Sequence, residues 1–169
     1  MSGSSVFVKK SMDETTGLLA VTTEERFYMS KGVAFVASLV NATLGAATDM
    51  DMLFRVASGY IAIVSPRLGG IAEARLRVYD GPTTSADGAA LAEINKNRAS
   101  TETANCAAFS GPTVSAAGTL LSDDLASVAG AMPQGSFILD AGDYLIRATN
   151  LNAGAQPVGI AMHWAELTA

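Results

Sequence analysis

The chain contains one short phrase that is written twice, with the two copies starting thirty positions apart. Residues 81–91 read GPTTSADGAAL, and residues 111–121 read GPTVSAAGTLL. Each copy opens with Gly-Pro, a pair that ends a strand because proline fixes φ and has no N–H to donate to a sheet. Each copy also holds a second glycine, Gly88 or Gly118, at which the chain can adopt a positive φ. The duplication therefore predicts a pair of matched loops in a β-sandwich.

Much of the remaining chain alternates apolar and polar residues, which is the pattern of strands with one buried face. Residues 137–139 and 144–149 flank a turn at residues 140–143 and predict a hairpin. The pair Ser65-Pro66, followed by two glycines, predicts that the preceding strand ends there. Strands are expected at residues 33–40, 53–57, 60–64, 72–79, 137–139, 144–149 and 158–166.

Three segments have a less regular pattern. Residues 27–47 fit either a helix or a strand that is buried on both faces, and the strand is favoured because both faces are apolar and glycines bracket the segment. Residues 120–132 are expected to hold one helical turn, with Ser122 as its cap and two aspartates in the first turn. Residues 93–100 are dense in side chains that hydrogen-bond their own backbone.

These patterns predict one domain, residues 27–169, preceded by an N-terminal arm, residues 1–26. The expected architecture is all-β, an antiparallel β-sandwich with jelly-roll topology. Within the arm, Val6, Phe7 and Val8 form a short β-prone patch in polar sequence. Either the arm is a frayed terminus, or this patch adds a strand to the sheet of a neighbouring subunit.

Composition restricts the partners of such a domain. Apolar residues make up 49% of the 169 and charged residues only 16%, against a usual charged share of about 25%, so some apolar surface is expected to lie against other proteins. The net charge is −5 and the densest basic run is Lys9-Lys10, which argues against nucleic acid as a ligand. The most apolar window, residues 32–47, is too short for a membrane span. Acidic residues follow Lys9-Lys10 at the place where a signal peptide would have its apolar core, so we expect no signal peptide.

The residues that could carry out catalysis are few and scattered. His163 is the only histidine, so a serine triad cannot be completed without it and a metal site has little support. Carboxylates occur in pairs, and each pair could bind calcium, serve as a glycosidase pair, or simply lie in a solvated turn: Asp49 with Asp51, Asp123 with Asp124, and Asp140 with Asp143. Cys106 is expected to be a small buried residue. We expect no cofactor, no metal and no enzymatic activity.

Arginine and tyrosine are favoured at protein interfaces, and two places in the chain present them. Arg75, Arg77 and Tyr79 lie on the polar face of one expected strand. Arg98 lies in the polar segment at residues 93–100, where it could order its own loop or reach a carboxylate on a neighbouring subunit. Together with Val6, Phe7 and Val8, these residues are our candidates for a subunit or capsid interface.

Several short motifs resemble those of a known family. They are Tyr79-Asp80-Gly81, the block Asn95-Lys96-Asn97-Arg98-Ala99-Ser100, the strand Gly142 to Asn150 and the closing Trp164-Ala165-Glu166. In this order the chain, from Gly32 to Glu166, is similar to small virion proteins of tailed bacteriophages, the capsid decoration or cement proteins with a jelly-roll fold. The resemblance implies a protein, made in the host cytoplasm, that binds the major capsid protein on the exterior of the virion. We expect a homotrimer or homodimer, because paired edges remove the exposed strands that a sandwich would otherwise present. The alternative is a tail or head-fibre module that binds host carbohydrate.

Overall fold

The computed structural model describes residues 11–12, 19–20, 24–70, 73–126, 132–133 and 136–169. Within these residues the protein is almost entirely β, and its helical content is the short helix α1, Glu24–Ser30. The strands are β1 (Ser11–Met12), β2 (Leu19–Ala20), β3 (Ala34–Leu44), β4 (Asp49–Val56), β5 (Tyr60–Gly70), β6 (Ala74–Asp80), β7 (Thr83–Ala86), β8 (Ala89–Ala90), β9 (Ile94–Asn95), β10 (Ala107–Ser110), β11 (Thr113–Ala116), β12 (Thr119–Ala126), β13 (Met132–Pro133), β14 (Phe137–Leu139), β15 (Gly142–Asn150) and β16 (Gln156–Thr168).

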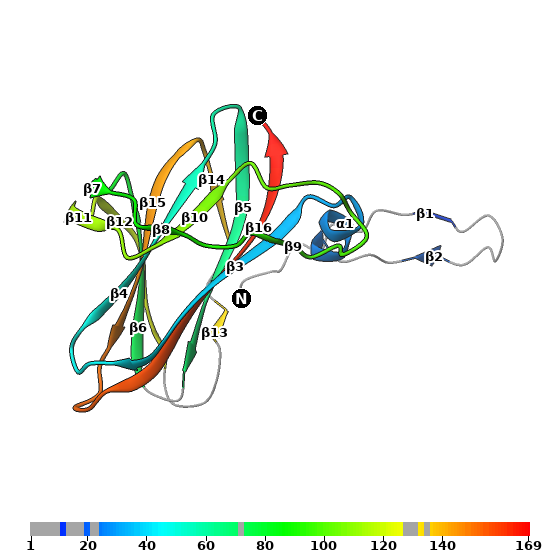
Figure 1. The fold of residues 1–169 in the computed structure, drawn as a ribbon. Coiled ribbons are helices and arrows are strands. Elements are labelled where there is room, and N and C mark those ends of the chain that lie inside the picture. The colour runs from blue at the N-terminus through cyan, green and yellow to red at the C-terminus, as the bar shows by residue number, and fades with distance from the viewer. Residues whose placement is uncertain (1–10, 13–18, 21–23, 71–72, 127–131, 134–135) are drawn as a thin grey trace.

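Two antiparallel sheets pack face to face as a β-sandwich, which confirms the expected all-β class (Figure 1). Sheet I has the strand order β12-β6-β15-β4-β10-β8. Sheet II has the order β13-β5-β16-β3-β9, and β14 also pairs with β5. The long strands mostly alternate between the sheets along the chain, so most connections cross from one layer to the other.

The core lies between the two sheets and is built from the inward residues of the long strands. Ile160, Met162 and Trp164 on β16 are buried as their alternation predicts. The indole of Trp164 stacks on Phe35 of β3, with ring centroids 5.8 Å apart, and meets Phe54 of β4 edge-on at 5.2 Å. Aromatic pairs of this geometry add about 0.5–1.5 kcal/mol beyond the area that they bury. Trp164 therefore joins the two sheets at the centre of the core.

The duplicated phrase forms a small ribbon of its own. β7 and β11, one from each copy, pair with each other and not with either large sheet. A Cβ on Gly88 would lie 2.1 Å from the carbonyl oxygen of Ser110, and a Cβ on Gly118 would lie 2.1 Å from that of Asp80. Both glycines have φ near the same value, +93° and +91°. The second glycine of each copy thus packs against the start of the other copy, so the two phrases are related by approximate twofold symmetry.

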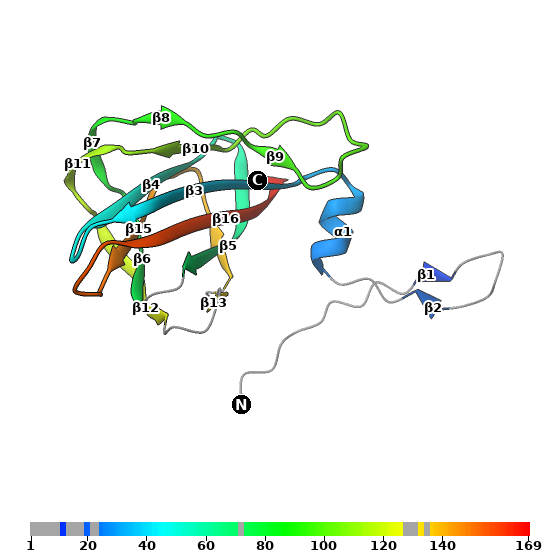
Figure 2. The same ribbon diagram turned by 60° about the horizontal axis from the view of Figure 1, so that its bottom comes forward.

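Residues 81–118, which connect β6 to β12, cover one side of the sandwich. β10 and β8 extend sheet I beyond β4, and β9 pairs with β3 at the margin of sheet II. Figures 1 and 2 show the β7/β11 ribbon at one end of the sandwich and α1 at the other. Since an unpaired edge strand invites aggregation, this segment protects the β3 and β4 edges.

One expected strand end and one expected hairpin are wrong. β5 continues to Gly70 instead of ending at Ser65-Pro66. Pro66 is tolerated because it lies between the part of β5 that pairs with β14, which ends at Val64, and the part that pairs with β13, which begins at Arg67. The expected hairpin at residues 136–150 is also wrong, because β14 pairs with β5 in sheet II whereas β15 pairs with β4 and β6 in sheet I.

The ambiguous segments differ from expectation in type. Residues 119–126, expected to include a helical turn, form β12 along β6, because pairing with seven residues of that strand outweighs a local helix cap. Residues 27–47 are divided between α1 and β3. β3 is not buried on both faces along its length, since the Val40 side chain is 71% exposed.

The N-terminal region is described only in part. β1 and β2 pair with each other and with neither sheet. The boundary expected after residue 26 falls inside α1, which begins at Glu24 and contacts β3. The patch Val6-Phe7-Val8 lies outside the described residues.

Candidate functional site

The outer face of sheet I carries a network of arginines and aspartates. Arg147 on β15 donates from Nε and Nη2 to the two carboxylate oxygens of Asp51 on β4, both at 2.7 Å. Asp49 lies 3.4 Å from both Arg147 and Arg77 and accepts a hydrogen bond from Thr149. Asp49 and Asp51, one of the three carboxylate pairs considered for calcium or glycosidase chemistry, are therefore both bound by arginine.

The other aspartates on this face are paired in the same way. Arg55 binds Asp143 through Nε and Nη2, at 2.7 and 2.9 Å, and binds Asp87 of the β7–β8 turn at 2.8 Å. Arg75 binds Asp123. The hydrogen bond from each arginine lowers the pKa of Asp87 and of Asp123. These ion pairs hold the strands and the β7–β8 turn together on the outer face.

The predicted interface residues have different surroundings in the structure. Arg75 and Arg77 are partly exposed within the network, but Tyr79 is only 9% exposed. Tyr79 lies in register with Leu145, which is in register with Leu53, and both leucines are fully buried. Tyr79 can therefore contribute little to a contact with another subunit.

Arg98 is exposed in the loop that follows β9. Hydrogen bonds of the neighbouring side chains order this loop: Asn95 Oδ1 accepts from Asn97 N at 2.8 Å, and Asn97 Oδ1 accepts from Ala99 N at 3.1 Å. Asn95 Nδ2 also donates to the carbonyl oxygens of Gly32 and Glu102. The expected self-bonding of residues 93–100 is confirmed, with asparagines in the ordering role that we considered for Arg98.

The edge strand β12 exposes apolar side chains beside the arginine network. Leu120, Leu121 and Leu125 are exposed, and Leu125 is 65% accessible. Leu125 is in register with Arg75 and Leu120 with Tyr79. In the described part of the chain, β12 pairs only with β6, so its other edge has no strand beside it. Sequence reasoning missed this surface because it assigned a helical turn here.

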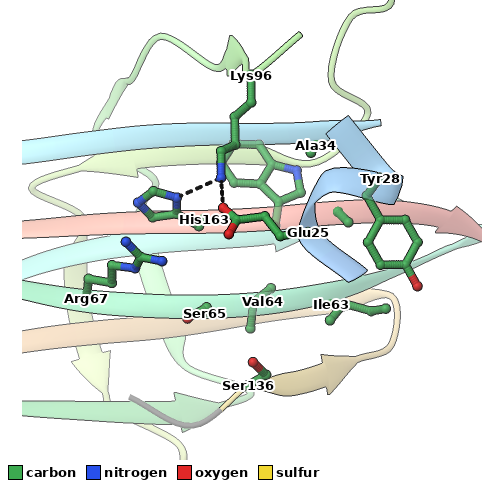
Figure 3. Close-up of a pocket in the computed structure, with 12 residues that line it drawn as sticks. Glu25, Tyr28, Ala34, Ile63, Val64, Ser65, Arg67, Lys96, Ser136 and His163 are labelled. Atoms are coloured by element: carbon green, nitrogen blue, oxygen red, sulfur yellow. Dashed lines mark hydrogen bonds and ion pairs between the residues drawn. The ribbon is translucent and has the colours of Figure 1, made fainter. Parts of the chain in front are cut away.

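A pocket of about 230 Å³ lies between α1 and the outer face of sheet II (Figure 3). Its charged and imidazole groups come from four separate parts of the chain: Glu25 on α1, Arg67 on β5, Lys96 directly after β9, and His163 on β16. The Lys96 ammonium binds the Glu25 carboxylate and lies 3.4 Å from Nδ1 of His163. Figure 3 shows Lys96 reaching both groups, with the Arg67 guanidinium beside the imidazole.

The pocket is electrostatically positive. Burial, followed by the charges of Arg67 and Lys96, lowers the pKa of His163 to about 4, so the imidazole is neutral at pH 7. The hydrogen bond from Lys96 lowers the pKa of Glu25. The pocket thus places the basic side chains of Arg67 and Lys96 around one carboxylate, that of Glu25. The sequence offered His163 as a lone histidine, and nothing in its spacing connected it to Glu25 or Lys96.

Glu166 is a buried carboxylate, 5% exposed. It accepts hydrogen bonds from the backbone N–H groups of Asn105 and Cys106, at 2.8–3.0 Å, and from Trp164 Nε1 at 2.9 Å. These bonds attach the loop before β10 to β16. Burial raises the pKa of the Cys106 thiol to about 12, in keeping with the expected inert, buried cysteine.

A second recess, of about 370 Å³, lies near the C-terminal end of β16. Its lining includes the aromatic residues Phe27, Tyr28 and Tyr60, together with Lys31 and Asn105. This gathering of aromatic and polar groups brings together α1, the start of β5 and the loop before β10. Sequence reasoning did not find it, because these residues are far apart in the chain.

The comparisons with known proteins add no relative. No protein-family model matches the chain, and no curated protein matches it.

Among the described residues, no group of three or more histidine, cysteine, aspartate or glutamate side chains could hold a metal ion. In the same part of the chain, no helix has the length and apolar character of a membrane span.

Proposed function

We propose that this protein is a structural virion subunit, a decoration protein that binds the outside of a bacteriophage head and stabilises the lattice of the major capsid protein. It acts by binding and not by catalysis. A protein that binds an assembled lattice more tightly than its loosened form stabilises the lattice, by about 2.7 kcal/mol per site at a concentration of one hundred times the dissociation constant. Many such sites over a shell add to a large total.

The strand order supports the jelly-roll topology that this proposal includes. Four strands follow the order β3-β16-β5-β14 in sheet II, of which β14 is only three residues long, and four follow β4-β15-β6-β12 in sheet I. Two four-stranded antiparallel sheets built from eight strands are the layout of a jelly roll. The segment between β6 and β12 is then an insertion between two neighbouring strands of one sheet.

The leucine-lined edge of β12 is the observation that carries the proposal. An exposed apolar edge strand in a folded protein is a liability unless another chain covers it. A second copy of this protein is the simplest cover, because a symmetric oligomer can bury the same edge in every subunit. The charged residues beside it, Arg75 above all, would form the polar rim of such an interface.

The experiment has two measurements. Light scattering after size exclusion gives the oligomeric state, and thermal disruption of purified capsids lacking the protein, with and without added protein, gives its effect on the shell. We expect an oligomer and a higher disruption temperature. Leu125→Lys should reduce both, whereas the matched control Ile138→Lys, at a side chain that is 72% exposed on β14, should behave as wild type. A monomer that leaves capsids unaffected would refute the proposal.

One observation favours a second candidate, a fibre module that binds host carbohydrate. The recess lined by Phe27, Tyr28 and Tyr60 has the aromatic surfaces and polar neighbours that suit a sugar ring. Binding to host cells or immobilised glycans, lost in Tyr60→Ala and unaffected by Leu125→Lys, would support this function over the first.

A further inference from the structure

The pocket under α1 has a cation whose hydrogen-bonding capacity is not used. Arg67 Nε is buried and has no hydrogen-bond partner. Across the described residues, Arg67 also takes part in no ion pair. A buried donor without an acceptor destabilises the folded protein, and it does so more strongly when the group is charged. The site therefore favours a ligand that accepts from this guanidinium.

Other arginines of the same protein show what such a group binds. Arg55, Arg75 and Arg147 each donate from Nε and Nη2 to both oxygens of one aspartate. This side-on arrangement needs the Nε–H that is unpaired in Arg67. Planar, bidentate recognition is a property of carboxylates and of phosphate groups.

The charge and size of the pocket distinguish between these two chemistries. Arg67 and Lys96 carry two positive charges, the Glu25 carboxylate supplies one negative charge, and His163 is neutral. One additional negative charge balances the site, whereas a phosphate dianion would leave an excess of negative charge beside Glu25. The volume of about 230 Å³ is small, and Ala34 and Ile63 give it apolar walls.

We propose that this pocket binds one carboxylate group, held side-on by Arg67 with Lys96 as the second cation. The carboxylate comes either from a free small acid or from an acidic side chain of a protein that docks against α1. Glu25 already binds Lys96 and competes with the ligand for the positive charge. The binding is independent of whether the protein decorates a capsid.

His163 makes this proposal directly measurable, because it is the only histidine in the chain and lines the pocket. Its imidazole carbon-bound protons give isolated NMR signals. We would titrate the full chain with sodium acetate, with the capped peptide acetyl-Gly-Glu-Gly-amide and with inorganic phosphate. The titrations are made at about pH 8, where inorganic phosphate is mainly the dianion, while sodium chloride holds the ionic strength constant. We expect saturable shifts with a carboxylate, at a dissociation constant on the order of 1 mM.

Three variants define the outcome. Arg67→Gln should abolish saturation, and Arg67→Lys, which keeps the charge but loses the side-on edge, should weaken binding. Glu25→Gln should tighten acetate binding by about fivefold or more, because it removes a nearby negative charge. Arg75→Gln, on the opposite outer face, is the matched control and should bind as wild type. Near-ultraviolet circular dichroism checks that each variant is folded.

The two carboxylate arms identify the source. Tighter binding of the peptide than of acetate indicates an acidic side chain of a partner, and the reverse indicates a free acid. The proposal is overturned if neither carboxylate saturates, if phosphate binds more tightly than both, or if folded Arg67→Gln binds as well as wild type.

Discussion

Replacing Gly118 by alanine tests the reciprocal packing of the duplicated phrase. The new Cβ would lie 2.1 Å from the carbonyl oxygen of Asp80, at a φ of +91°. The left-handed backbone costs a non-glycine residue about 1–2 kcal/mol, and displacing a packed neighbour costs about 1–3 kcal/mol. We therefore expect Gly118→Ala to lower the free energy of unfolding by about 2–5 kcal/mol, a large part of the roughly 5–15 kcal/mol of a typical domain.

The control is Gly111→Ala in the same copy. Gly111 has a φ of +64°, but a Cβ there would meet nothing within 4 Å, so only the backbone cost of about 1–2 kcal/mol applies. Gly88→Ala should match Gly118→Ala, because its Cβ would lie 2.1 Å from Ser110 O. Urea unfolding followed by the fluorescence of Trp164, the single tryptophan, measures all three. Equal losses in all three variants would refute the reciprocal packing.

Three further predictions concern the titratable groups. Glu166→Ala should lower the free energy of unfolding by about 3 kcal/mol or more, because it leaves several buried N–H donors without an acceptor; urea unfolding measures this. Burial raises the pKa of the Cys106 thiol from 9.0 to about 12, so Cys106 should resist a thiol reagent at pH 8 until urea unfolds the protein. The free energy of unfolding should also fall as pH rises above 9, because the thiol ionises first in the unfolded chain. Burial lowers the pKa of His163 from 6.5 to about 4, so the free energy of unfolding should fall as pH drops through that range, by about 1–2 kcal/mol after solvent screening. His163→Gln should remove this contribution to the pH dependence, as measured by thermal melts at pH 4–7.

The fold class was accessible from the sequence because strand periodicity is a local property. The alternation in β6 and β16 identified their buried faces correctly, and the Gly-Pro pairs marked the ends of β6 and β10. The same local signals failed at Asp140–Asp143. The same residue types form a turn whether the next strand pairs with the previous one or joins the other sheet. The sequence pattern therefore could not exclude that the chain crosses between sheets from β14 to β15.

The candidate sites were less accessible, because their residues converge only after folding. Asp49 and Asp51 were noticed as a pair, but their arginine partners lie on β6 and β15. Glu25, Arg67, Lys96 and His163 come from four separate parts of the chain, and no spacing along the chain connects them. The exposed leucines of β12 were missed because Ser122 suits a helix cap and the two aspartates after it suit the first turn of a helix.

The amino-acid sequence by itself determined that this chain forms short, turn-bounded strands with one apolar face, because side-chain alternation and glycine or proline conformation act over a few neighbouring residues. Tertiary structure alone decided which sheet each strand joins, which edge stays open and which charges meet. Those outcomes depend on hydrogen bonds and packing between segments that are distant in the chain. The energy of such a contact depends on both segments, so the sequence of either one alone does not predict it.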